Sequence, residues 1–174
     1  MGDIASSAVK PPWKISLLDA IKEKVGNICN IYYASSYHKA KRIAAKADVV
    51  ILLVSLTWQD EGENTPFGGG DRKKLELSTK YIALIKNISN INKNCIVVVQ
   101  GGSAICVDDW IGNIPALIMA WYPGMQGGRA IADVLFGDYN PAGRLPLSIP
   151  KSTKQLPSFD SKSKEVVYDY WHDY

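Results

Sequence analysis

Long hydrophobic runs, a leader segment and paired cysteines are all missing from this sequence. No apolar run reaches the roughly 18 to 20 residues that a membrane-spanning helix needs. Residues 1–10 show no basic region followed by an apolar stretch, so no signal peptide is predicted. The three cysteines, Cys29, Cys95 and Cys106, are odd in number and lack metal-ligand spacing. They indicate no disulfide scaffold, and Cys29 and Cys95, which lie in apolar runs, are expected to be buried free thiols.

A large excess of positive or negative charge is also missing. The 20 basic and 17 acidic side chains leave a net charge of +3, and the lysines are scattered, which argues against nucleic-acid and membrane partners. The two histidines, His38 and His172, are far apart, and neither has a neighbour at metal-ligand spacing. The sequence contains no Gly-x-Ser-x-Gly motif and no Cys/His arrangement that indicates a nucleophile. It therefore implies no metal and no cofactor.

What is present is an alternation of short apolar strands and amphipathic helices. The 174 residues, 47% of them hydrophobic, suffice for one domain with a real core. Hydrophobic periodicity predicts helices at residues 16–26, 37–47, 73–89 and 128–136 and strands at residues 28–34, 48–56, 95–100 and 116–121, in alternation except for the last two strands. Residues 49–54 are apolar on both faces, which is typical of a central parallel strand.

This alternation predicts an α/β fold with a flavodoxin-like, doubly wound, mostly parallel sheet in a three-layer α/β/α sandwich. Residues 1–15 offer no strand, so we expect the sheet to lack its first strand. The sandwich is predicted over residues 1–150. Residues 151–174, which are polar and rich in serine and lysine, are expected to form an irregular tail.

Three loops leave the carboxyl ends of predicted strands, where open parallel sheets bind their ligands. The first, residues 57–71, is rich in acidic side chains and is followed by an arginine; these residues are Asp60, Glu61, Glu63, Asp71 and Arg72. One interpretation is a solvated acidic loop with an ion pair. The other is a carboxylic acid held against an apolar wall such as Trp58, where it keeps its proton and can donate it. Composition alone does not choose between them.

The other two loops, residues 101–109 and 122–128, are rich in glycine. Residues 101–103, Gly-Gly-Ser, directly follow a strand, and we interpret them as a site of close backbone packing. Residues 124–128, Gly-Met-Gln-Gly-Gly, open a helix and so raise the alternative of a phosphate cradle. They lack the spacing of both the dinucleotide fingerprint and the P-loop, which argues against phosphate.

Several segments, in chain order, resemble the C-terminal α/β sandwich domain of family 3 glycoside hydrolases. Residues 48–62 and 70–77 are similar to that family's apolar strand, Glu-Gly loop, Asp-Arg pair and helix. Residues 18–26 resemble its first helix, and residues 96–102 its strand ending in a glycine turn. Residues 120–128, AWYPGMQGG, resemble its Trp-x-x-Gly-Gln-x-x-Gly loop. The run at 131–146, IADVLFGDYNPAGRLP, is the strongest match.

The resemblance implies a retaining, exo-acting β-glycosidase of the β-glucosidase or β-xylosidase type. In such enzymes one carboxylate attacks the anomeric carbon, and a second carboxyl group about 5 to 5.5 Å away acts as acid and then as base. The family places the nucleophile, an aspartate, on a preceding (β/α)8-like barrel domain. By resemblance the acid/base is Glu61, with Glu63 as the alternate. Asp71 and Arg72 then anchor the loop and line the sugar site, where a β-linked glycoside or oligosaccharide binds.

The sequence also departs from the family. No segment of this sequence is identified as the barrel or as the first strand of the sandwich, and residues 64–69 lengthen the loop between the Glu-Gly and Asp-Arg pairs. We therefore expect little or no glycosidase activity from this chain alone. The alternatives are a non-catalytic module that binds carbohydrate or docks onto a barrel, and a flavodoxin-like domain with a nucleotide-binding or structural role. A secreted or vacuolar parent enzyme is compatible with the family, but the sequence assigns no compartment.

Overall fold

The computed structural model describes residues 9–61, 72, 74–157, 160, 162–167 and 170. Within these ranges, three parallel strands form one sheet in the order β1-β2-β3: β1 is Val50–Ser55, β2 is Cys95–Gln100 and β3 is Ala116–Met119. Val50 lies opposite Cys95 and continues in register to Ser55 opposite Gln100, while Ile96 lies opposite Ala116. The predicted parallel strands at 48–56, 95–100 and 116–121 are confirmed.

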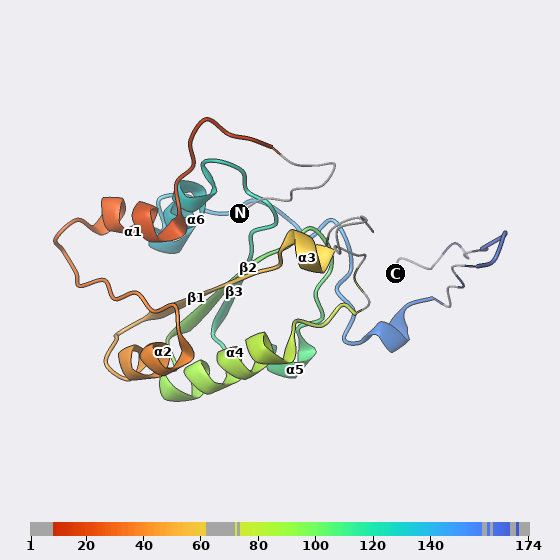
Figure 1. The fold of residues 1–174 in the computed structure, drawn as a ribbon, viewed down its shortest axis with the longest axis horizontal. Coiled ribbons are helices and arrows are strands. Elements are labelled where there is room, and N and C mark those ends of the chain that lie inside the picture. The colour runs from red at the N-terminus through yellow and green to blue at the C-terminus, as the bar shows by residue number, and fades with distance from the viewer. Residues whose placement is uncertain are drawn as a thin grey trace.

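Helices cover both faces of this sheet (Figure 1). On one face lie α1 (Leu17–Val25) and α6 (Gly127–Phe136), which pack against each other. The other face is covered by α2 (Tyr37–Ala44), α4 (Thr79–Ile91) and the short α5 (Asp108–Ile111). A further short helix, α3 (Trp58–Glu61), follows the carboxyl end of β1, and a 3-10 turn, η1 (Thr153–Gln155), lies in the C-terminal segment. The predicted α/β fold with helices on both faces of a parallel sheet is therefore confirmed.

Each face of the sheet has its own hydrophobic core, because successive strand side chains point to opposite sides. On the side of α4, Val97 and Val99 of β2 are buried together with Trp110 of α5. On the side of α1 and α6, Val98 is buried against Leu17 and Ile131. The central strand β2 is thus buried on both faces, as its apolar sequence predicts for a parallel strand.

Capping residues explain where the helices begin. Ser16 accepts a hydrogen bond from the Asp19 backbone N–H at 3.1 Å and starts α1. Ser78 accepts from the Tyr81 N–H at 3.4 Å, so α4 begins at Thr79, later than the predicted residue 73. The residues before it are engaged elsewhere, since Glu76 forms an isolated parallel bridge with Cys106.

Close backbone contact joins α6 to the start of α1. A Cβ atom on Gly128 would lie 2.6 Å from the carbonyl oxygens of both Ile15 and Ser16, so only glycine fits there. The Ile15 N–H donates to the Met125 carbonyl at 3.2 Å. On the surface, Arg129 pairs with Glu23 at 3.1 Å. The predicted glycine loop at 124–128 thus serves helix packing.

Residues 28–34 differ from their prediction, because they form no strand. Among the described backbone hydrogen bonds, that of the Ile28 N–H to the Val25 carbonyl is the only one this segment makes. Ile28 is 91% exposed and Tyr32 62% exposed. Cys29 is exposed as well, so the prediction of a buried thiol is wrong there and right for Cys95. A short apolar run becomes a strand only where a neighbouring strand pairs with it, and β2 is the partner of β1 in the described sheet.

The helices that the structure describes include none long and apolar enough to cross a bilayer.

Candidate functional site

The loops that follow β1, β2 and β3 meet at the carboxyl ends of the strands. Ladder-like hydrogen bonds continue past the strands, from Leu56 N–H to the Gln100 carbonyl at 2.9 Å and from Ala120 N–H to the Val99 carbonyl at 2.8 Å. The starting points of the three loops are therefore fixed by the sheet. Figure 1 shows α3, which belongs to the first loop, at this edge.

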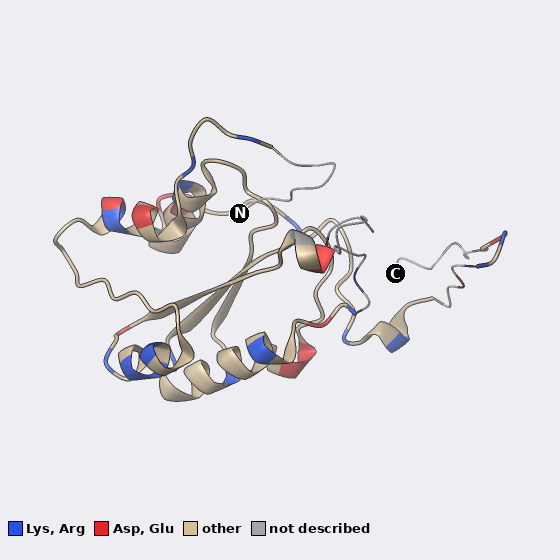
Figure 2. Cartoon of the chain, in the orientation of Figure 1, with Lys and Arg blue, Asp and Glu red and all other residues tan. Residues whose placement is uncertain are grey.

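Asp60 stabilises the first turn of this loop. Its carboxylate accepts hydrogen bonds from the backbone N–H and the hydroxyl of Thr57, both at 2.8 Å. The Asp60 and Glu61 N–H groups donate in turn to the Thr57 carbonyl. Asp60 is thus occupied in holding α3, and Glu61 becomes the last residue of that helix, at the acidic end visible in Figure 2.

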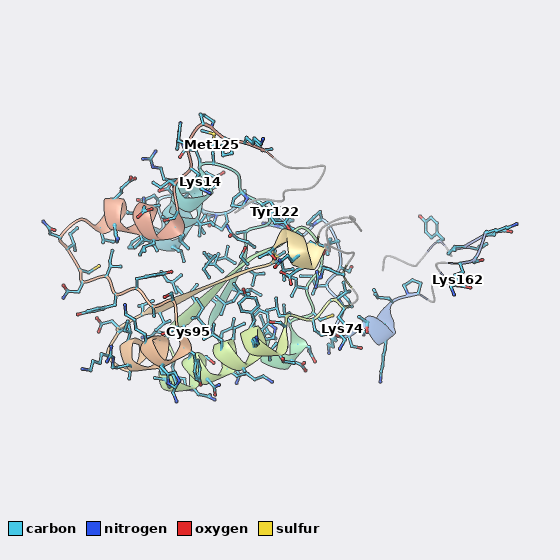
Figure 3. The ribbon with its side chains drawn as sticks, in the orientation of Figure 1. Lys14, Lys74, Cys95, Tyr122, Met125 and Lys162 are labelled. Atoms are coloured by element: carbon cyan, nitrogen blue, oxygen red, sulfur yellow. The ribbon has the colours of Figure 1, made fainter. Side chains whose placement is uncertain are left out.

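Glu61 is the centre of the site, because its carboxylate accepts hydrogen bonds from two other loops. The Gly102 N–H donates to Oε2 at 2.7 Å, and the Ser103 hydroxyl donates to Oε1 at 2.9 Å. The Tyr122 hydroxyl also donates to Oε2. Figure 3 shows Tyr122 beside α3. One side chain from the loop after β1 therefore joins the loops after β2 and β3.

Arg72 balances the charge of Glu61 but is bonded mainly to other groups. Its Nη1 lies 3.5 Å from Glu61 Oε1, and both side chains are 10% exposed. Nη1 donates to the Ser103 hydroxyl oxygen and to the Ala104 carbonyl, each at 2.7 Å, and Nη2 donates to the Leu75 carbonyl at 2.8 Å. Arg72 thus ties the segment before α4 to the loop after β2.

One unusual backbone conformation and one close contact bring Tyr122 to Glu61. Among described residues other than glycine, Trp121 alone has a positive φ, 49°, which is uncommon for a bulky side chain. A Cβ atom on Gly102 would lie 2.8 Å from the Tyr122 ring. Gly102 therefore leaves room for the tyrosine, and Trp121 turns the chain so that the tyrosine reaches the carboxylate.

Behind the site, the Cys106 thiol is buried and free. Burial raises the pKa of Cys106, as does the negative charge of Glu76, while Arg72 lowers it. The net effect is an increase, which keeps the thiol protonated at neutral pH and therefore unreactive.

The structure brings together part of the site predicted from the sequence. Glu61 and Arg72 lie side by side, whereas Glu63 and Asp71 lie outside the described residues. Sequence reasoning missed Ser103 and Tyr122 as members of the site. The available signal was positional, since Gly-Gly-Ser directly follows β2, Trp-Tyr-Pro begins two residues after the end of β3, and the ends of these strands share one edge.

The fold and the site define a class of protein: an α/β sandwich domain with a carboxylate–arginine pair at the carboxyl ends of its parallel strands. A family model described as the glycosyl hydrolase family 3 C-terminal domain matches residues 1–174. This chain belongs to that family.

Its relatives include a β-xylosidase from Formosa agariphila, 35% identical over 157 residues, covering 84% of this chain and 21% of that protein. A β-glucosidase from Schizophyllum commune is 34% identical over 171 residues, covering 91% of this chain and 88% of the relative. The crystal structure of a Bifidobacterium adolescentis GH3 β-glucosidase superposes with a TM-score of 0.74 at 30% identity, covering 88% of this chain and 23% of that one. The chain spans about a fifth of the Formosa agariphila relative.

Proposed function

We propose that this chain is the C-terminal domain of a retaining, exo-acting β-glycosidase that hydrolyses O-glycosyl bonds of β-glucosides or β-xylosides. Its role is to supply the general acid/base from the loop after β1. The observation that carries the proposal is the acidic end of α3, held beside Arg72 at the carboxyl ends of a parallel sheet. That edge is where open α/β sheets bind ligands.

The reaction needs two carboxyl groups. In the first step the nucleophile forms a bond to the anomeric carbon, the glycosidic C–O bond breaks, and the leaving oxygen takes a proton from the acid. In the second step the resulting carboxylate removes a proton from water, which displaces the nucleophile. Glu61 is the first candidate for the acid/base and Glu63 the alternate. Asp71 and Arg72 are proposed to line the sugar site, and an aspartate on a barrel domain of the parent enzyme supplies the nucleophile.

A non-catalytic module that binds carbohydrate or docks onto a barrel is the second candidate function. One observation favours it: among the described residues, three groups from two other loops donate hydrogen bonds to the Glu61 carboxylate, so both of its oxygens are engaged within the domain. Such a module would carry the same fold without taking part in proton transfer.

The first test is hydrolysis of 4-nitrophenyl β-glucoside and β-xyloside by the purified chain. A general acid alone contributes about 10²- to 10⁴-fold, so without a nucleophile and an oriented sugar we expect no turnover above the protein-free rate. Robust turnover that is lost in Glu61→Ala would contradict this, and would place a nucleophile in this chain.

The second test joins the full chain to the part of the Formosa agariphila β-xylosidase that precedes its matching segment. The proposal predicts that this chimera hydrolyses aryl xylosides and that Glu61→Gln or Glu63→Gln removes the acid. Loss of the acid affects poor leaving groups strongly and activated ones, such as 2,4-dinitrophenolate, little. A chimera that folds and hydrolyses both classes equally well in each variant supports the non-catalytic module.

A further inference from the structure

We propose that Glu61 is a positioning residue and that another carboxyl group of the loop after β1 delivers the proton. Glu61, Tyr122, Ser103 and Arg72 form a latch that holds this loop against the loops after β2 and β3. The inference rests on the proposed function, because it assigns roles within the same acid/base loop.

The hydrogen-bonding capacity of the Glu61 carboxylate supports the latch. Three donors, the Gly102 N–H and the hydroxyls of Ser103 and Tyr122, point hydrogens at its two oxygens. A carboxylate accepts such bonds, whereas a protonated carboxyl group becomes a donor at one oxygen. For Glu61 to carry a transferable proton, the hydroxyl of Ser103 or Tyr122 would have to turn and accept that proton, so the carboxyl group, whose side chain is 10% exposed, would lose one of its three donors.

The hydrogen-bond donors next to Glu61, Ser103 and Arg72, are also engaged with groups of the protein. The Ser103 hydroxyl has one hydrogen, which it gives to Glu61, and its oxygen accepts from Arg72. Arg72 Nη1 carries two hydrogens, and these go to Ser103 and to the Ala104 carbonyl. Arg72 therefore cannot turn toward a ligand without breaking bonds to three protein acceptors.

The backbone around the latch also supports the inference, because it takes up a strained conformation and a close contact at the residues that bring Tyr122 to Glu61. The positive φ of Trp121 is an unfavourable conformation of a kind that persists only where the surroundings enforce it. The missing side chain at Gly102 makes room for Tyr122. Both features bring the Tyr122 hydroxyl to Glu61, which makes Tyr122 a positioning residue as well.

The contact itself can be tested in the full chain by NMR of tyrosine labelled with ¹³C at Cζ. Tyr122 is assigned as the resonance missing from Tyr122→Phe. We expect that resonance to shift in Glu61→Gln and to stay in place in Glu23→Gln, a matched change at a surface carboxylate whose side chain is 54% exposed. An unchanged Tyr122 resonance in Glu61→Gln overturns the latch.

The role is tested in the chimera described above, with substrates of graded leaving-group ability. Tyr122→Phe is expected to lower kcat about tenfold for poor leaving groups and less than about twofold for activated ones, because a displaced acid is ineffective where protonation is needed. Tyr139→Phe, at a tyrosine that is 61% exposed, is the control. A Tyr122→Phe loss that is equal across all leaving groups overturns the positioning role.

Azide separates the latch from the proposed function. In a variant that lacks the acid/base, azide displaces the nucleophile of the glycosyl-enzyme, forming a C–N bond as the C–O bond breaks, and a glycosyl azide accumulates. We expect this product from Glu63→Gln and not from Glu61→Gln. Glycosyl azide from Glu61→Gln would contradict the positioning role of Glu61 and would still support the proposed function. An active chimera in which neither variant gives the azide refutes the assignment of the acid/base to Glu61 or Glu63, and with it the proposed function.

Discussion

At the scale of single residues, Gly102 controls whether the three strand-end loops fit together. Its N–H donates to Glu61, and its missing side chain leaves space for the Tyr122 ring, which a Cβ atom would approach to 2.8 Å. The atom it would meet belongs to a side chain that is itself bonded to Glu61. Relief of the clash therefore has to move the tyrosine away from the carboxylate.

We predict that Gly102→Ala destabilises the chain by about 1–3 kcal/mol, the usual range for an overpacked site. The measurement is urea unfolding followed by circular dichroism. Gly112→Ala is the control, because that glycine has φ −67° and nothing within 4 Å of its added Cβ. There we expect no loss, or a gain of about 0.4–1 kcal/mol from the stiffer unfolded chain. Equal stability of the two variants would show that Tyr122 does not occupy the space beside Gly102.

Cys95 gives a prediction about alkaline pH. Burial raises the pKa of Cys95 from 9.0 to about 11 in the folded chain. The folded state then holds this proton more tightly than the unfolded state, so the stabilisation is complete below pH 9 and is lost as the pH rises through 11. At 1.36 kcal/mol per unit, the loss is at most about 2.7 kcal/mol.

We expect the free energy of unfolding of the wild type to fall more steeply between pH 9 and 11 than that of Cys95→Ala. The comparison of slopes removes the contribution of lysines and tyrosines that titrate in the same range. Cys29→Ser, at an exposed thiol, should follow the wild-type slope. If the free energy of unfolding of Cys95→Ala fell with the same slope as that of the wild type, deprotonation of the Cys95 thiol would not be coupled to unfolding.

Of the four side chains of the latch, two were identified from the sequence and two were not. Glu61 and Arg72 were identified because the Glu-Gly and Asp-Arg pairs in which they lie resemble those of family 3 glycoside hydrolases, whereas composition alone did not separate them from the other charged residues of the loop. Ser103 and Tyr122 were not, because their role depends on the direction of a hydroxyl and on the φ of Trp121. Sequence patterns carry the position of a loop along the sheet edge but not the orientation of its side chains.

At the scale of elements, β1 is an edge strand of the described sheet, whereas β2 is its central strand. Its one strand partner in the described sheet is β2, and it carries no charge or proline within Val50–Ser55. Leu53 is 46% exposed, and Val49, just before the strand, is 53% exposed. Edge strands of this kind pair readily with other chains unless a charge or proline blocks them.

We predict that Leu53→Lys lowers aggregation of the chain during heating and refolding while changing its stability by less than about 0.5 kcal/mol. Light scattering during a thermal ramp measures the first effect, and urea unfolding the second. Tyr139→Lys, which adds the same charge at a residue that is 61% exposed outside the strands, is the control. An equal reduction by both variants would attribute the effect to net charge rather than to the strand edge.

The elements also show which predictions sequence periodicity supports. Residues 95–100 were predicted correctly because a run that is apolar on both faces fits a central strand wherever helices cover the sheet. Residues 28–34 were predicted as a strand on similar composition, but composition does not report whether a neighbouring strand is present. The short helices α3 and α5 escaped prediction because four residues are too few to show a helical period.

At the scale of the whole molecule, the two faces of the sheet are unequal in buried apolar material. The face under α2, α4 and α5 buries Trp110, Ile85, Ile88 and several side chains of β1 and β2. The opposite face buries a smaller set around α1 and α6, namely Leu17, Ala20, Val98, Ile131 and Ala132. Because hydrophobic burial is the main stabilising contribution, stability should differ between the two layers.

We predict that α1 and α6 open together before the rest of the domain. In hydrogen exchange under native conditions, their amides should exchange with a lower free energy of opening than those of α4 and β2. Gly128→Ala places a Cβ 2.6 Å from the carbonyls of Ile15 and Ser16, so it should lower that opening energy further and leave the α4 amides nearly unchanged. Gly143→Ala, with open space around it, is the matched control. If all helices exchange at one common free energy in the wild type, the domain unfolds as a single unit and the α1–α6 layer has no separate stability.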